Sequence, residues 1–331
     1  MKNKKTQWFR ILGMLLAFSM LFSLSGTFAA ESPYPTKIVR IIVPFPPGGS
    51  NDIVARLIAA RLSDRFGKQV IVENRPGAGT VIGVELVAKS DPDGYTLLLS
   101  GSAFTINPAL YKLPYDPVKG FVPVVKLGSG PALLTVHPSV PANSVKELIA
   151  LAKEKPGKLI CAAVGVGTFQ HLGAELFKLM AGVDFKIVHF KGGGPATTDQ
   201  LGGHSQVMFA SLTQVLPQVK SGKLRGLGTG GLRRSAAVPD IPTISEAGLP
   251  GYESSIWWGI HAPAATPQAI LDRLQKEIAE IVKSPEMHKI FHDQGAEVDY
   301  LPPVEFNKFV GAEIAKWGRV VKEANIQVEK K

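Results

Sequence analysis

The feature that most constrains the fold is one order of predicted elements that occurs twice along the 331-residue chain. In each copy a buried strand leads into a glycine-rich loop, an amphipathic helix, a glycine that stops the helix and a second strand. The first copy starts with a strand at 38–43 and the second with a strand at 159–163. Because strands that alternate with helices pair in parallel, the pattern predicts an α/β fold with two similar domains that face each other.

The rest of the sequence extends both predicted domains. Apolar and β-branched runs predict strands at 38–43, 69–73, 95–99, 159–163, 185–190, 206–210, 224–228 and 256–261. Apolar residues on one face predict helices from 50–52 to Gly67, at 81–88, from Thr168 to Gly182, through Val215 and Val219, at 267–282 and at 303–324. We expect residues 31–129 and 228–331 to form the first domain, 130–227 to form the second, and two crossing strands to form a hinge.

The first thirty residues have the pattern of a secretory signal peptide. Four cations in the first ten residues precede an apolar run at 11–22, and cleavage is predicted after Ala29, or after Ala30. The alternative is an uncleaved membrane anchor, but the run is shorter than the ~20 residues that a membrane span needs. Residues 1–30 are therefore predicted to be removed during export to a bacterial periplasm.

Charge and cysteine content argue against several classes of function. The chain has a net charge of +10, and removal of the four cations of the predicted signal peptide leaves +6. Its basic residues are scattered and lack interleaved aromatics, which argues against nucleic-acid binding and leaves a weak attraction for anions. The one cysteine, Cys161, lies in a predicted buried strand and can form neither an internal disulfide nor a cysteine-rich metal site.

The glycine loops at 44–52 and 164–168 are candidate anion sites. Each joins a strand to the start of a helix, where backbone N–H groups lack partners within the helix and the helix dipole is positive. A lysine would have to follow the glycines for a Walker-type phosphate loop, and it follows neither Gly49 nor Gly167. A dinucleotide site would need a third glycine where Gln170 stands. The sequence predicts a clamp for a carboxylate between the two loops.

The sequence contains little that predicts a catalytic site or a metal-binding site. No G-x-S-x-G motif occurs, and no serine, histidine and aspartate fall in a recognisable catalytic order. His288 and His292 have the spacing of two metal ligands on a helix, but no third ligand follows, so an exposed pair is the favoured interpretation. A periplasmic hydrolase that uses His171 or Asp52 remains an alternative from a different class.

Four other residues have two interpretations each. His171 follows Thr168 in the first turn of a helix, where it can contact a ligand or hold the loop. Asp52 can act chemically, but a carboxylate at this position more often satisfies helix N–H groups. Trp257 and Trp258 can line a ligand pocket or pack in the core.

Several motifs together resemble one family along the whole mature chain. They are Pro44–Gly49 with Asp52 and Arg56, Asn74–Gly79, Asn107–Tyr111, Gly165–Thr168 with His171 and Leu172, Lys191–Gly192 with Pro195 and Ala196, Gly222–Arg225, and Pro239–Thr243 through Glu246–Gly248. In this order they are similar to the Bug family, the periplasmic substrate-binding receptors of tripartite tricarboxylate transporters. The resemblance is specific to the family and does not identify a ligand.

The resemblance implies a two-domain type II periplasmic binding protein that closes like a flytrap on a small organic carboxylate. Receptors of this family hold the carboxylate between two loops, partly through ordered water. The implied binding residues of the first domain are Phe45, Pro47, Gly48, Gly49 and Asp52. Those of the second domain are Ala163, Gly165, Gly167, Thr168 and His171.

The chain departs from the family after the predicted strand at 206–210. Ala210 and Ser211 stand where family members commonly carry an acidic residue and an asparagine, so an acid that could bind an amine is missing, while Ser211 stays a candidate ligand contact. Val166 and Ala163 also replace residues that are often polar. These departures favour an aromatic or aliphatic carboxylate over an amino acid.

The resemblance also sets the expected partners. It implies a monomer without a cofactor or metal, which binds no nucleic acid, has no enzymatic activity and delivers its ligand to the membrane permease subunits of a tripartite tricarboxylate transporter. The alternative is a sensory receptor that presents its closed form to a membrane sensor kinase.

Overall fold

The computed structural model describes residues 34–323 and 326. The chain divides into a unit that ends at Thr36 and a unit that starts at Lys37, and the sheet, core and site described below belong to the second unit. The predicted signal peptide, 1–30, lies outside the described residues. None of the helices in the described part is long and apolar enough to cross a membrane.

Each predicted strand and helix has a counterpart in the structure, and six further strands and α-helices occur in its described part: α4, β4, α5, α7, α10 and β10. The strands are β1 (Val39–Val43), β2 (Val70–Asn74), β3 (Thr96–Gly101), β4 (Phe121–Val136), β5 (Ile160–Val164), β6 (Lys186–Phe190), β7 (Val207–Ser211), β8 (Arg225–Thr229), β9 (Ser255–Pro263) and β10 (Glu297–Leu301). The α-helices are α2 (Ser50–Phe66), α3 (Val81–Ala88), α4 (Ser102–Ile106), α5 (Val145–Glu154), α6 (Phe169–Ala181), α7 (Gly193–Leu201), α8 (Leu212–Lys220), α9 (Gln268–Val282), α10 (Pro285–Asp293) and α11 (Pro303–Glu323). Two short 3₁₀ turns are η2 (Ala78–Thr80) and η3 (Asn107–Ala109).

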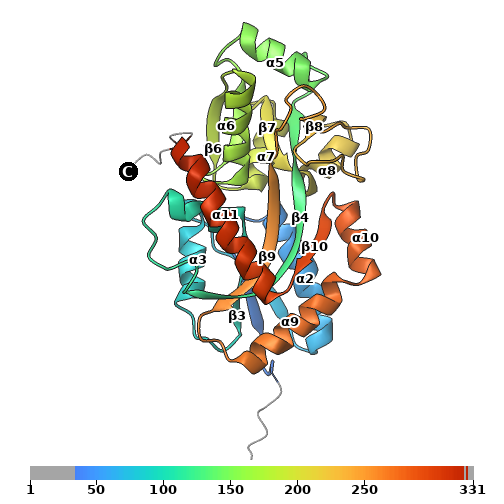
Figure 1. Cartoon of the computed structure of the whole chain (residues 1–331). Helices are drawn as coiled ribbons and strands as arrows, with labels where there is room; N and C mark the ends of the chain where they lie inside the picture. Colours follow the sequence, from blue (N-terminus) through green and yellow to red (C-terminus); the bar gives the residue numbers. More distant parts are fainter. Residues whose placement is uncertain (1–33, 324–325, 327–331) are drawn as a thin grey trace, which may run out of the picture. The chain divides into compact units, whose positions relative to one another are not determined.

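The strands of the described part join one sheet in the order β2-β1-β3-β9-β4-β7-β5-β6, and β8 and β10 also pair with β4. We call β1, β2, β3, β10 and the elements packed on them the first half, and β5 to β8 with their helices the second half. The pairs within each predicted copy are parallel: β1 with β2 and β3, and β5 with β6 and β7. The strands β4 and β9 are antiparallel to each other and link the halves, as Figure 1 shows.

The long strand β4 was not predicted, because its sequence contains residues that usually interrupt strands. Pro123 lies beside one shift in the register with β9, and a second shift lies between Lys126 and Gly128. Bulges of this kind let a strand continue past a proline. A Cβ at Gly128 would lie 2.5 Å from the carbonyl oxygen of Glu297, so close pairing with β10 requires glycine there. The predicted domain boundary at 129/130 falls within β4, and the boundaries stay predictions.

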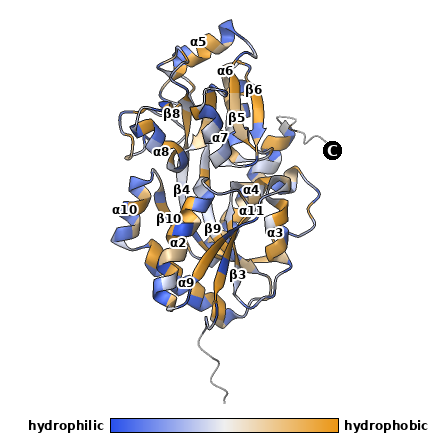
Figure 2. Ribbon diagram, turned by 180° about the vertical axis from the view of Figure 1, so that it is seen from behind, coloured by the Kyte–Doolittle hydropathy of each residue, from blue (hydrophilic) through white to orange (hydrophobic). Residues whose placement is uncertain are grey.

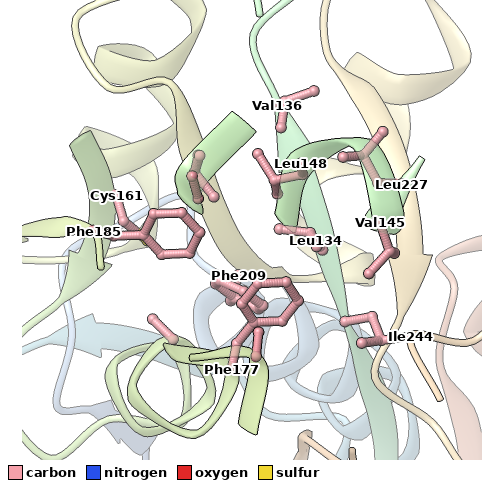
Figure 3. Close-up of a cluster of buried hydrophobic side chains, with 14 of the residues drawn as sticks. Leu134, Val136, Val145, Leu148, Cys161, Phe177, Phe185, Phe209, Leu227 and Ile244 are labelled. Atoms are coloured by element: carbon pink, nitrogen blue, oxygen red, sulfur yellow. The ribbon is translucent and has the colours of Figure 1, made fainter. Parts of the chain in front are cut away.

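The second half has its own apolar core between its sheet and α5 and α6, shown in Figure 3. The rings of Phe177 and Phe209 lie 5.2 Å apart, and Phe177 also stacks on Phe185 at 5.9 Å. Cys161 is fully buried in this core, as predicted, and burial raises the pKa of its thiol to about 12. The thiol is therefore protonated and unreactive at neutral pH.

The first half packs its core around buried strands and the helix α11. Figure 2 shows its strands mostly in hydrophobic colours, with hydrophilic stretches on the helices around them. Trp257 packs edge-on against Phe306 and Phe309, with ring centroids 5.7 and 5.4 Å apart, and Trp258 lies 6.4 Å from Phe291. Both tryptophans are therefore core residues, which decides between the two interpretations of this pair.

Candidate functional site

The loop between β1 and α2 is held in place by the carboxylate of Asp52. This carboxylate accepts hydrogen bonds from the backbone N–H of Gly48 at 3.1 Å and from Asn74 Nδ2 at 3.0 Å. It also pairs with Arg56 at 2.9 Å. Burial opposes ionisation, but these donors together hold the pKa of Asp52 below its usual range. Asn74 Nδ2 also donates to the carbonyl of Phe45, so one cluster fixes both glycine loops of the first copy.

The loop between β5 and α6 is held by neutral groups. Thr168 caps α6 by accepting from the N–H of His171 at 3.4 Å, and its hydroxyl donates to the carbonyl of Val164. The ring nitrogen Nδ1 of His171 accepts from the N–H of Gly167 at 3.3 Å. His171 therefore supports the loop from behind, and its ring faces His189 edge-on at 4.8 Å.

The surroundings of His171 favour its neutral form. Burial, with smaller contributions from the neighbouring His189 and Lys178, lowers the pKa of His171 to about 4. Glu175 Oε1 lies 3.8 Å from Nε2 of His171, and Lys178 pairs with Glu175 at 3.3 Å. At neutral pH the imidazole is uncharged, which leaves Nδ1 able to accept the hydrogen bond of the loop.

The loops of the two halves are in contact. A Cβ at Gly194 would lie 2.7 Å from the carbonyl oxygen of Pro47, and one at Gly192 would lie 2.7 Å from Pro46. The glycines of the turn between β6 and α7 therefore pack closely against the ring of Pro46 and the backbone of Pro47.

A second contact between the halves lies at the other glycine loop. Gly167 has a φ of +81°, and a Cβ there would lie 2.3 Å from a methyl group of Leu110. Beside it, Tyr111 Oη donates to the carbonyl of Val166 at 3.3 Å. This hydrogen bond links residues on opposite sides of the cavities described next.

The starts of several helices converge on a small inner chamber of about 20 Å³, which has room for roughly one water-sized group. Glycine or serine precedes α2, α7 and α8, and none of these N-cap residues makes a side-chain cap hydrogen bond. Side chains with buried oxygens that lack a hydrogen-bond partner among the described residues also line the chamber: Asn51, Ser102 and Gln214. All of the lining residues are uncharged. The hydroxyl of Ser102 can donate a hydrogen bond, whereas the amide oxygens of Asn51 and Gln214 can only accept. The donors at the helix starts and on Ser102 suit a small anion.

A larger outer chamber of about 430 Å³ adjoins the inner one, because Phe45, Val164 and Thr168 line both. Its walls come from the loop after β1 and the turn at 76–80 on one side, and from the ends of β5 and β6 on the other. Apolar side chains and glycines form most of its surface. The two chambers together provide a polar end and an apolar body for one ligand.

The predicted binding residues fall into three groups. Phe45, Gly49 and Thr168 line the inner chamber, and Gly165 lines the outer one. Four residues form or hold the adjoining loops, with Gly167 at the contact between the halves: Gly48, Asp52, Gly167 and His171. The remaining three line neither chamber: Pro47, whose carbonyl faces Gly194, and Ala163 and Ser211, which are fully buried.

Sequence reasoning missed ten residues that line the inner chamber, and all of them except Ile256 lie at or just after the carboxyl end of a strand: Ser50, Asn51, Ser102, Ala103, Val164, Phe169, Gln170, Gly193, Gln214 and Ile256. The available signal was their position at the carboxyl ends of predicted strands, where ligands bind in open α/β sheets. Gln214 donates to the carbonyl of Gly193 at 2.9 Å, which brings two of the missed helix starts together.

The spacing of His288 and His292 does not build a metal site within the described residues. His288 and His292 lie exposed on α10, and residues 34–323 and 326 contain no group of three or more side chains suited to hold a metal ion. A serine and a histidine do meet in the first half, where Ser100 Oγ lies 2.8 Å from His261 Nδ1. Both are buried away from the chambers, and burial lowers the pKa of His261 to about 3.

Solved structures of similar proteins show the class of protein to which this fold belongs. The structure matches that of R. palustris Rpa4515 with adipate, at 35% identity and a TM-score of 0.87, over 89% of this chain and 99% of that one. It also matches MatC of Rhodopseudomonas palustris with bound malate, at 31% identity and a TM-score of 0.80, over 87% and 100%. A third match is the periplasmic binding protein BugD, at 33% identity and a TM-score of 0.85, over 89% and 99%. The predicted α/β, two-domain periplasmic binding protein fold is confirmed.

The sequence comparisons then give the family. The model described as the tripartite tricarboxylate transporter family receptor matches residues 54–326. BugT of Bordetella pertussis is 36% identical over 323 residues, which cover 97% of this chain and 99% of BugT. The chain therefore belongs to the tripartite tricarboxylate transporter receptor family, and the resemblance to the Bug family is confirmed.

Proposed function

We propose that this protein is a periplasmic receptor that captures a small organic carboxylate between its two domains and delivers it to the permease of a tripartite tricarboxylate transporter. The observation that carries the proposal is the inner chamber, where α2, α7 and α8 start without side-chain caps beside the buried, unpaired hydroxyl of Ser102, which can donate a hydrogen bond. A carboxylate placed there accepts hydrogen bonds from the N–H groups, and the helix dipoles stabilise its charge.

The capture step follows from the position of the chambers between the halves. A ligand that contacts the loop after β1 and the loop after β5 binds the closed form more tightly than an open one. Its binding therefore shifts the equilibrium toward the closed form. In this proposal closure presents the ligand to the permease, and the receptor performs no chemical step on it.

Two similar proteins support a carboxylate as the ligand. Rpa4515 is described with adipate and MatC with malate, and both are more than 30% identical to this chain. The family match supports a transporter as the partner. The periplasmic location rests on the predicted signal peptide at 1–30 and on relatives described as periplasmic.

A thermal-unfolding screen tests the proposal. The protein is purified from the periplasm of a bacterial host, refolded to remove carried-over ligand, and mixed with mono-, di- and tricarboxylates and amino acids. A ligand at 100 times its dissociation constant adds about 2.7 kcal/mol of stability, which raises Tm by several degrees. We expect carboxylates to raise Tm, with calorimetry confirming one site per chain. A panel in which no carboxylate raises Tm would refute the proposed ligand class.

A further inference from the structure

We propose that Lys191 determines specificity by pairing with a second anionic group at the far end of the ligand. This inference rests on the proposed function, because it places the first carboxylate of the ligand in the inner chamber. The preferred ligand is then a molecule with a carboxylate at one end, an apolar body and an anion at the other end.

The sizes of the two chambers indicate that the ligand is larger than a single carboxylate group and that the rest of it occupies the outer chamber. The inner chamber, of about 20 Å³, has room for roughly one water-sized group, whereas the outer chamber measures about 430 Å³. The volume of the outer chamber lies within the range of pockets that bind whole small molecules. A ligand with its head in the inner chamber therefore extends past Phe45 and Thr168, which line both chambers.

The walls of the outer chamber suit a hydrocarbon body. Pro44, Phe45 and Pro76 contribute apolar surface from the first half, and Val164 and Phe190 contribute it from the second. An aliphatic chain or a ring that fills this space gains about 25 cal/mol for each Å² of apolar surface that it removes from water. Burial of this surface favours a body of several carbon atoms over a small hydrophilic acid.

Lys191 supplies the one permanent charge among the described residues that line the outer chamber. It follows the last residue of β6 and is exposed, and its ammonium group makes no hydrogen bond or ion pair within residues 34–323 and 326. The other titratable group of the lining, His189, has a pKa below its usual range because of partial burial, so it is neutral at pH 7. The field in this chamber therefore attracts an anion.

The same charge discriminates against amino acids that carry an amine at the far end. An ammonium group in the outer chamber would lie near Lys191, and like charges at short range repel. A monocarboxylate of equal length gains the apolar contact but no ion pair. The expected order of affinity is diacid, then monoacid, then ω-amino acid.

Calorimetry with matched sets of ligands tests this order. The probes are butanedioate and butanoate, hexanedioate and hexanoate, and benzene-1,4-dicarboxylate and benzoate, with 6-aminohexanoate as the cationic analogue. In each pair that binds, we expect the diacid to bind about fivefold more tightly, the factor expected of a partly exposed ion pair. Lys191→Met should remove this preference and leave the affinity for the monoacid unchanged.

Two further variants separate charge from folding and local packing. Lys186→Met removes an exposed lysine from the other end of the same strand, and it should keep the preference for diacids. Lys191→Glu should reverse the order, so that 6-aminohexanoate binds more tightly than hexanedioate. Because partial unfolding lowers the apparent affinity for both ligands by the same factor, it cannot produce this reversal.

The outcomes distinguish this inference from the proposed function. If no acid of the panel binds, the carboxylate receptor proposal fails, and this inference fails with it. If monoacids bind as tightly as their diacids, or if Lys191→Met weakens both members of a pair equally, the receptor proposal stands and Lys191 is not the specificity residue.

Discussion

The two glycine loops that meet at the inner chamber have similar positions in their halves but are held by different chemistry. The loop after β1 depends on an ionised carboxylate, since Asp52 accepts from Gly48 and Asn74 and pairs with Arg56. The loop after β5 depends on a neutral imidazole, since His171 accepts from Gly167. The difference shows that a similar loop can be held by either a charged or an uncharged hydrogen-bond acceptor. The two loops should therefore respond differently to mutation and to pH.

The largest expected loss of carboxylate affinity comes from a side chain placed at Gly167, where the loop after β5 contacts the first half. Gly167→Val places a side chain where Leu110 lies 2.3 Å from the Cβ position, so the closed form is blocked and carboxylate binding falls below detection by calorimetry. The matched control is Gly182→Val, which has a similar positive φ of +62° but no neighbour within 4 Å. Both variants carry backbone strain, and only the first should lose binding.

A side chain at the first loop sharpens this comparison. A Cβ at Gly49 would lie 3.7 Å from the nearest atom of Gly193, which is an ordinary contact, so Gly49→Ala should keep measurable affinity whereas Gly49→Leu should not. Equal losses in Gly49→Ala and Gly167→Val would mean that the two loops are packed alike.

The next prediction concerns stability, which should fall when the Asp52 carboxylate that holds the loop after β1 is removed. Asp52→Ala leaves the donors on Gly48 and Asn74 without their acceptor, and it should lower the free energy of unfolding by about 2 kcal/mol. Thermal unfolding measures this as a decrease of several degrees in Tm. Asp64→Ala, an exposed carboxylate on the same helix, should change Tm by less than about one degree. A similar Tm for both variants would contradict the assigned role of Asp52.

The pH dependence of stability separates the two loops. The pKa of His171 is about 4 in the folded protein and 6.5 in a model peptide, so the folded state binds fewer protons between these values. The free energy of unfolding therefore decreases as the pH falls through this window, by about 2 kcal/mol from this group at pH 5. Asp52 has a lowered pKa, so its contribution is lost only when the pH falls below 3.8, the ordinary pKa of an aspartate.

Thermal unfolding at pH 7 and pH 5 measures this difference. We expect His171→Gln to reduce the loss of Tm between the two pH values, because the amide oxygen can accept from Gly167 without titrating. His288→Gln, an exposed histidine on α10, should leave the loss unchanged. An unchanged loss in His171→Gln would assign the acid sensitivity to another group, such as His189 or His261.

The smallest expected effect concerns the one hydrogen bond described between the second loop and the opposite half. Tyr111→Phe removes the donor to Val166 and should weaken carboxylate binding about fivefold, the factor that corresponds to about 1 kcal/mol. Calorimetry measures the change, and Tyr300→Phe on β10 serves as the control. An affinity equal to that of the unmodified protein would show that closure does not depend on this bond.

Both glycine loops could be predicted from the sequence, because glycine runs between a strand and a helix have few other uses. The long strand β4 could not, because Pro123, Lys126 and Gly128 are unfavourable in a strand by local propensity. Bulges against β9 and the close approach of β10 overcome that propensity, and both depend on residues far away in the sequence.

Residues of the candidate site could be predicted only where they lie within a recognisable sequence motif, such as a glycine loop. Gly49 and Thr168 lie in the recognised loops and line the inner chamber, whereas Ser102 and Gln214 contribute to it from the starts of α4 and α8. The role of His171 behind the loop depends on its ring orientation and on burial against His189, which spacing does not report.

The contact of Gly192 and Gly194 with Pro46 and Pro47 has a consequence for how this scaffold can be altered. At this contact the second half contributes glycine backbone without side chains, whereas the walls of the outer chamber are mostly side chains. Substitutions in those walls can therefore change which molecule is recognised while the packing of the two loops at the glycines keeps its geometry. An engineer who wants a fluorescent sensor for a new metabolite can redesign the outer chamber and place the reporter dyes at the edges of the glycine contact.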